Sequence, residues 1–152
     1  MKLSIEMSKK KAEIDFSDGS SLSGHFFVLL HAQGRVGGEC LLDLLLDERS
    51  YLPFEVDGGQ ILLLQKGSIV LVKSEGCEYL KGVSYQRKME TRITFISGRT
   101  LEGKVYSDLP QSKSRLSDFL NHSRRFFCLE AEGNEYLVNT QFIKSAEPST
   151  PS

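Results

Sequence analysis

The chain has few of the features that define several common protein classes. It contains no run of about 20 apolar residues, the length that a helix needs to cross a bilayer, and residues 1–9 hold no apolar stretch typical of a secretory signal. Its three cysteines, Cys40, Cys77 and Cys128, are odd in number and widely spaced. Disulfide frameworks normally show paired spacing. We therefore expect a soluble cytoplasmic protein with reduced thiols.

An excess of charge of one sign is also missing. The 152 residues carry 19 Lys and Arg against 20 Asp and Glu. Residues 10–75 hold 6 basic and 10 acidic side chains, a net charge of −4, whereas residues 88–148 hold 9 and 8, a net charge of +1. A nucleic-acid backbone would be repelled by the first segment and only tolerated by the second. This pattern predicts no membrane binding and makes nucleic acid an unlikely partner.

Histidines are scarce, and no metal-ligand spacing includes them. His25, His31 and His122 belong to no CxxC, HxxxH or HxxE pattern. The glycine-rich stretch 34–38 lacks the Lys-Ser/Thr that follows a phosphate-binding loop. No combination of nucleophile, base and orienting residue emerges either. We therefore predict no catalytic residues, no metal and no cofactor.

The sequence does contain one pattern twice. Residues 14–27 match residues 93–106 with an offset of 79 (93 − 14). Both stretches alternate apolar and polar residues around a turn, which predicts a β-hairpin. A glycine recurs in each turn, and a second one in each returning strand, where it indicates a bulge or a bend. These structural positions are Gly19 and Gly98 in the turns, and Gly24 and Gly103 in the strands.

The segments that follow the hairpins match as well. Residues 41–58 align with residues 116–133 with an offset of 75 (116 − 41). Both begin with apolar residues at i, i+3 and i+4, the spacing of a short helix with one apolar side. We expect that side to be buried in both helices. Its residues are Leu41, Leu44 and Leu45 in the first helix, and Leu116, Phe119 and Leu120 in the second.

Two short buried strands are predicted over residues 60–64 and 68–72. The offset of 75 aligns Leu62 and Leu63 with Leu137 and Val138, and one further residue of slippage aligns Ile69 with Ile143. Consistent offsets with gaps only in loops predict an internal repeat of about 75 residues. The predicted units are a first repeat over 10–75, a linker over 76–87, a second repeat over 88–148, and a disordered tail over 149–152.

Several charged residues recur in the two repeats. Asp43 and Asp118 occupy the same helical position, where capping of the helix or a bond to a nearby turn explains them better than catalysis. Arg124 matches Arg49 and is either a helix-end residue that covers a core strand or an anion contact. Nucleic-acid or anion binding is conceivable only in the second repeat, where three arginines lie close in sequence. They are Arg115, Arg124 and Arg125.

The repeated motifs resemble those of the Sm-like family. Residues 16–24 and 95–103 resemble the start of that family's first motif, and residues 63–69 resemble the strand-turn-strand of its second. The resemblance implies a mainly β fold of two tandem Sm-like five-stranded small barrels, each with a short inserted helix. It also implies RNA contact at the basic residue before the second motif's glycine, which is Lys66. The family's other RNA-contacting positions are largely absent.

These observations favour a non-enzymatic binding or scaffolding module. It would act through protein–protein or small-ligand contacts, and it would associate with a protein partner or with itself through strand edges. The alternative is a weak RNA-binding Sm-like protein that uses its second repeat. A protein-binding module should expose an apolar edge or patch, whereas an RNA-binding protein should show a basic groove lined with aromatic side chains.

Overall fold

The computed structural model describes residues 7–29, 40–75, 87–107 and 115–149. Most of the predicted linker and tail lie outside these ranges. The first half of the described chain comprises five strands, a short α-helix and a 3₁₀ turn. They are β1 (Met7–Phe16), β2 (Ser21–Leu29), α1 (Leu41–Leu46), β3 (Tyr51–Val56), β4 (Ile61–Gln65), the 3₁₀ turn Lys66–Ser68 and β5 (Ile69–Glu75).

The second half contains the same elements in the same order. They are β6 (Arg87–Phe95), β7 (Thr100–Ser107), α2 (Leu116–His122), β8 (Phe126–Ala131), β9 (Asn134–Asn139), the 3₁₀ turn Thr140–Phe142 and β10 (Ile143–Pro148). The prediction of a mainly β chain with a short helix after the second strand of each half is therefore confirmed.

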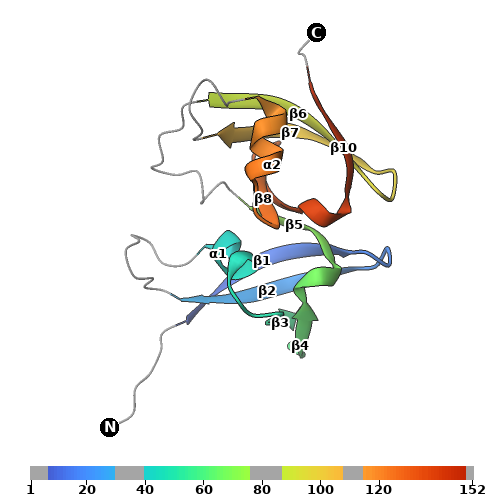
Figure 1. Cartoon of the computed structure of the whole chain (residues 1–152). Helices are drawn as coiled ribbons and strands as arrows, with labels where there is room; N and C mark the ends of the chain where they lie inside the picture. The colour runs from blue at the N-terminus through green and yellow to red at the C-terminus, as the bar shows by residue number, and fades with distance from the viewer. Residues whose placement is uncertain (1–6, 30–39, 76–86, 108–114, 150–152) are drawn as a thin grey trace.

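All ten strands belong to one antiparallel sheet, in the order β10-β6-β7-β8-β9-β5-β1-β2-β3-β4. Each half contributes five neighbouring strands with its fifth strand next to its first, and the halves join where β5 pairs with β9. Figure 1 shows the halves stacked with β5 between them. The sheet is open, with β10 and β4 at its edges. The prediction of two closed barrels is thus not confirmed, because the fourth strand of the second half pairs with the other half instead.

The backbone bonds of the two halves match in detail. In the first hairpin Phe16 N–H donates to Ser20 O, and in the second Phe95 N–H donates to Arg99 O. The turn glycines Gly19 and Gly98 have φ angles of 89° and 94°, a region that glycine adopts without strain. The fifth strand skips one residue against the first strand in both halves, so even the β-bulge is shared. Equivalent positions can therefore be assigned from strand pairing.

Strand pairing corrects one part of the sequence alignment. Leu63 lies opposite Pro53, and its counterpart opposite Cys128 is Leu137, so the offset is already 74 (137 − 63) in the fourth strand. The second half has one residue fewer in the turn that precedes this strand. The β8–β9 turn has only Glu132 and Gly133 between its last paired residues, both with positive φ, as in a two-residue hairpin turn.

The apolar sides of the two helices have different environments. Leu41, Leu44 and Leu45 of α1 are buried, as predicted. No residue of α2 is fully buried, although its matching apolar residues pack against the core of the second half. The prediction for α2 was therefore wrong in degree. The physical reason is that α1 also lies against β8 of the other half, and the groove beside α2 is open.

Candidate protein-interaction surfaces

The contact between the halves is itself a protein interface with backbone, polar and apolar parts. Its backbone ladder pairs Leu71 to Glu75 with Val138 to Asn134. The buried side-chain amide of Asn139 donates to Ile69 O at 2.8 Å. Arg99 in the second half forms an ion pair with Asp15 in the first. The interface therefore combines sheet extension with a specific hydrogen bond from a side-chain amide.

Three side chains of the second half complete the core of the first. Phe126 and Cys128 on β8 and Leu137 on β9 are buried in one cluster with the leucines of α1. They project from the outward face of the β8–β9 hairpin, away from the second half's own core. The first half thus buries its helix partly against its own core and partly against a neighbouring β-hairpin.

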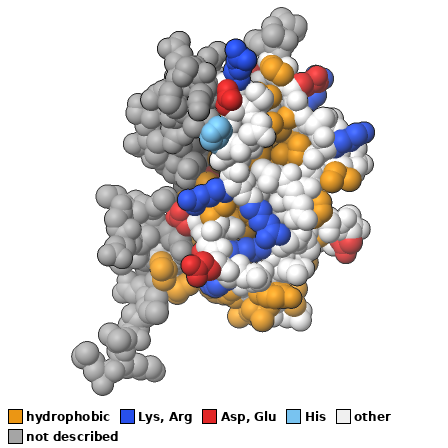
Figure 2. All heavy atoms as spheres, in the orientation of Figure 1, with side chains coloured by type: hydrophobic (Ala, Val, Ile, Leu, Met, Phe, Trp, Pro, Cys, Tyr) orange, Lys and Arg blue, Asp and Glu red, His pale blue; other side chains and the backbone are white. Residues whose placement is uncertain are grey.

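The equivalent hairpin of the first half is exposed. Tyr51 on β3 and Ile61 and Leu63 on β4 are 55%, 57% and 69% exposed, respectively. Together with the half-buried Pro53 they form one outward face, which we call the β4 edge surface. Figure 2 shows hydrophobic side chains gathered at the lower end of the molecule, where Figure 1 places β3 and β4. Among the described residues, β4 has a strand neighbour on one side only.

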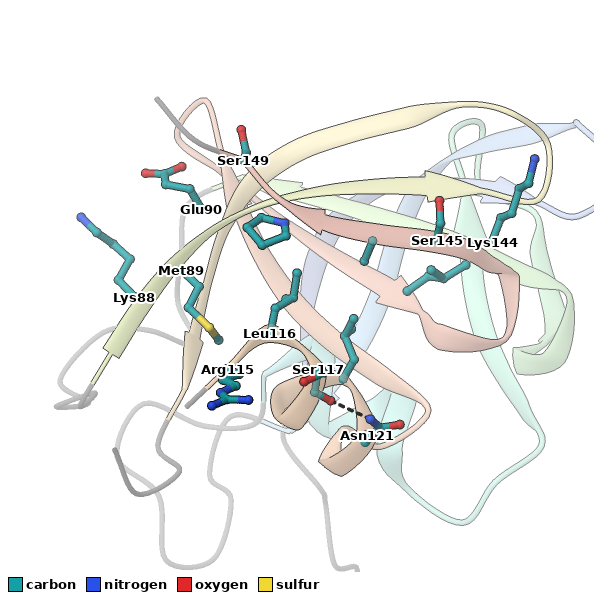
Figure 3. Close-up of a pocket in the computed structure, with 14 residues that line it drawn as sticks. Lys88, Met89, Glu90, Arg115, Leu116, Ser117, Asn121, Lys144, Ser145 and Ser149 are labelled. Atoms are coloured by element: carbon teal, nitrogen blue, oxygen red, sulfur yellow. Dashed lines mark hydrogen bonds between the residues drawn. The ribbon is translucent and has the colours of Figure 1, made fainter. Parts of the chain in front are cut away.

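A groove lies between α2, β6 and β10, and we call it the α2 groove. Its volume is about 940 Å³. Figure 3 shows Met89 and Leu116 projecting between the helix and the strands, and Asn121 donating to Ser117 O at 2.8 Å. The apolar lining comprises Met89, Leu116, Leu120, Ile143, Ala146 and Pro148, and the charged residues of the groove are Lys88, Arg115, Lys144 and the acidic Glu90.

The three arginines predicted as an anion site are divided by α2. Arg115 is the residue before the helix and lines the α2 groove. Arg124 and Arg125 follow the other end of the helix and are exposed. Arg125 bonds to Gln141 Oε1 at 3.4 Å and lies over Gly67 of the first half. The structure therefore places Arg115 at one end of α2 and the sequence neighbours Arg124 and Arg125 beyond the other.

The recurring Asp residues lie in the first turns of the helices. The Asp43 carboxylate accepts hydrogen bonds from the Cys40 N–H at 3.0 Å and from the Cys40 thiol at 3.1 Å, and so caps α1. Asp118 has the same position in α2, where negative charge stabilises a helix. Both residues therefore have positions that suit a structural role.

The glycines of the returning strands permit close approach of the third strand. A Cβ at Gly24 would lie 2.1 Å from Glu55 O, and one at Gly103 would lie 2.5 Å from Glu130 O. Neither position can hold a side chain without movement of the backbone. Both glycines sit inside strands, at the same place in each half.

Lys66, the position that the Sm-like resemblance links to RNA contact, is engaged inside the first half. Its side chain is buried, and Nζ bonds to Asp47 Oδ1 at 2.6 Å and to Asp47 O at 2.9 Å. Burial alone would raise the pKa of Asp47, but hydrogen bonds from Arg49 and Lys66 outweigh it and hold this pKa below its usual 3.8. The lysine therefore ties the 3₁₀ turn to the end of α1.

Other shifted groups lie on the surface. Ser20 donates to Asp18 and lowers its pKa, whereas Glu102 and Glu147 raise the pKa of Arg92. In the described ranges, no group of three or more His, Cys, Asp and Glu is placed to hold a metal ion. Cys40 and Cys128 are buried and belong to no disulfide among the described residues, and Cys77 lies outside those residues.

Sequence reasoning missed the β4 edge surface. It predicted a buried strand over residues 60–64, but a run of consecutive apolar residues places side chains on both faces of a strand. Leu62 and Leu64 face the core, whereas Ile61 and Leu63 face outward. The signal that could have found the surface was the unbroken apolar run itself, at the edge of a predicted sheet.

The fold defines a mainly β protein with two topologically equivalent halves and two candidate interaction surfaces. No helix in the described ranges combines the length and the apolar character needed to span a bilayer. Comparison of the chain with protein-family models, with curated proteins and with solved structures found no match.

Proposed function

We propose that the protein is a non-enzymatic binding and scaffolding module that acts through protein–protein contacts, with the α2 groove as its main binding site. The observation that carries the proposal is the open apolar lining of this groove beside the half-buried side of α2. Exposed apolar surface of this extent marks interaction sites in soluble proteins. We also propose that the protein is cytoplasmic and that its two halves are divergent Sm-like units.

The chemistry of the groove indicates the kind of partner. Its lining favours apolar side chains, and the excess of three basic residues over the single carboxylate of Glu90 favours acidic residues that flank them. The neighbouring edge of β10 offers backbone groups for strand addition, one of the common modes of peptide recognition. These features favour a protein segment over a small ligand, because a small ligand would not use the sheet edge.

Panning a displayed peptide library against the full-length protein tests the proposed function. Ser117 is exposed on the rim, so Ser117→Glu should fold normally and repel acidic segments. We expect enriched peptides to carry an apolar centre with acidic flanks and to lose about tenfold or more in affinity for Ser117→Glu. Ile96→Lys, on an exposed turn elsewhere, is the matched control. Enriched peptides that bind Ser117→Glu and the wild type equally would contradict the proposal.

A further inference from the structure

The strand at the β4 edge surface lacks the features that usually protect an edge. Residues 60–65 contain no charged residue and no proline, and the register of β4 with β3 is regular. Natural edge strands normally carry lysine, proline or a bulge that prevents pairing with other chains. Ile61 and Leu63 are also more than half exposed on the outward face. The composition of β4 therefore suits a strand that pairs with a further strand.

The bonding of β4 to β3 determines which of its backbone groups face the open edge. Val56 N–H donates to Gln60 O at one end of the hairpin, and Lys66 N–H donates to Ser50 O at the other. Hydrogen-bonded pairs alternate along an antiparallel ladder. The even-numbered residues of β4 therefore bond to β3, and the odd-numbered residues direct their N–H and C=O away from it. The outward residues are Ile61, Leu63 and Gln65.

Pro53 agrees with this alternation. It lies opposite Leu63, in a pair that exchanges no bonds with β4, so its missing N–H does not weaken the hairpin. Of the outward groups, Gln65 O accepts a hydrogen bond from Ser68 Oγ at 2.8 Å. A carbonyl oxygen has a second lone pair that a strand partner can use. The open edge thus offers three consecutive bonding positions.

These three positions are symmetric about Leu63. If Leu63 lies opposite Leu63 of a second copy in an antiparallel pair, Ile61 lies opposite Gln65 on both sides of the centre. Each of these pairs can exchange two backbone bonds. Every outward residue of both copies then has a partner, whereas a shift of two residues leaves one outward residue in each copy without one. The backbone of β4 is therefore complementary to itself.

The side chains fit the same register. Directly opposite residues lie on the same face of a sheet. Leu62 and Leu64, which face the core of the first half, would lie opposite each other and extend the inner apolar face. On the outer face, Pro53 and Leu63 of both copies would form one apolar row across the contact. A strand that pairs with its own copy brings like charges together, and the uncharged β4 avoids this cost.

We propose that β4 pairs antiparallel with β4 of a second copy, around a two-fold axis at Leu63, so that the protein is a symmetric dimer. Such a contact uses the same edge of both copies, so association stops at two. The α2 groove and β10 lie at the other end of the strand order and stay open. The dimer would carry two α2 grooves and bind a partner with two suitable segments by both. Only this last step rests on the proposed function.

Sedimentation velocity of the purified full-length protein, from about 1 μM to about 500 μM, tests the inference. Leu63→Lys and Leu63→Glu each place like charges opposite each other at the axis, so each variant alone should be monomeric. An equimolar mixture of the two places a lysine opposite a glutamate and should restore the dimer. Ile96→Lys adds a charge at another exposed apolar position, and Ser117→Glu alters only the α2 groove. Circular dichroism would establish that every variant is folded.

We expect the wild type, Ile96→Lys and Ser117→Glu to form dimers and nothing larger. Each Leu63 variant should lose about tenfold or more in affinity for its own copy. A wild type that is monomeric throughout, a species larger than a dimer, or a dimer that survives in the Leu63 variants would overturn the inference. So would a mixture that associates no better than either variant alone, because only a contact of Leu63 with Leu63 predicts the rescue.

The dimer and the proposed function can fail separately. A monomeric wild type that binds acidic apolar peptides through the α2 groove would overturn the dimer and leave the proposed function standing. A dimer that binds no such peptide would support the pairing of β4 and remove the function assigned to the groove. Loss of the dimer in Ser117→Glu would mean that the groove takes part in association, and it would also overturn the inference.

Discussion

Leu63 and Leu137 occupy equivalent positions in the two halves and have opposite environments: Leu63 is 69% exposed and Leu137 is 0% exposed. The difference arises because the β8–β9 hairpin is covered by the first half, while the β3–β4 hairpin lies at the end of the sheet. Comparable side chains thus act as core in one half and as surface in the other.

Alanine substitution of this pair should have unequal effects. Leu137→Ala should lower the free energy of unfolding by about 2–5 kcal/mol, because it removes a buried side chain and leaves a cavity. Leu63→Ala should change it by about 0.5 kcal/mol or less, as is usual for surface positions. Denaturant melts at low protein concentration would measure both. Equal losses would mean that Leu63 is covered in solution.

The two helices provide a second matched pair. Leu45→Ala in α1 should lower the free energy of unfolding by about 2–5 kcal/mol, since Leu45 is buried between the halves. Leu120→Ala in α2 should have a smaller effect, about 1–2 kcal/mol, because less apolar area of Leu120 is removed from water. The same melts give the comparison, and a larger loss for Leu120→Ala would place α2 in the core.

Asp47→Ala should destabilise the first half by about 1–3 kcal/mol, because it leaves the buried ammonium group of Lys66 with only a backbone acceptor. Adding Lys66→Met should restore part of the loss, since an apolar side chain of similar length needs no partner. The exposed neighbour Glu48→Ala serves as the control. If the double variant is as unstable as Asp47→Ala, the ion pair is not the cause.

The same carboxylate should make stability depend on pH in acid. The pKa of Asp47 in the folded protein lies below its usual 3.8, so folding favours the ionised form. Its contribution is fully present above the unfolded pKa of about 4 and is lost as the pH falls through the lower folded value. Melts from neutral pH to about pH 2 should show that the stability gap between wild type and Asp47→Asn narrows in this range. A gap that stays constant would argue against the shift.

Any binding of single-stranded RNA should be weaker than micromolar at about 0.15 M salt, the physiological ionic strength. Arg115 is separated from Arg124 and Arg125 by α2, and Lys66 is engaged with Asp47, so few cations can neutralise phosphates together. Fluorescence anisotropy with a labelled oligonucleotide would measure this. Micromolar binding that disappears when the three arginines become alanine would promote the alternative function.

Much of the local architecture could be predicted from the sequence. The hairpins over residues 14–27 and 93–106 follow from alternation and turn glycines, and the helices follow from the spacing of their leucines. Both signals lie within short stretches of the chain, so one sequence is enough to detect them. The alignment slipped by one residue at Leu62 to Leu64, because identical neighbouring side chains do not reveal register.

The arrangement of the halves could not be predicted in the same way. The pairing of β5 with β9 depends on which strand edges meet, and edges have no distinct composition here. The periodicity of α2 indicates that one side of the helix is apolar, but it does not say what covers that side. The burial of Lys66 depends on the carbonyl and carboxylate of Asp47, which are 19 residues away in sequence.

The covalent continuity between the halves makes their contact at β5 and β9 intramolecular. Diluting the protein therefore cannot separate the two β-units, because the chain holds each at a high effective concentration beside the other.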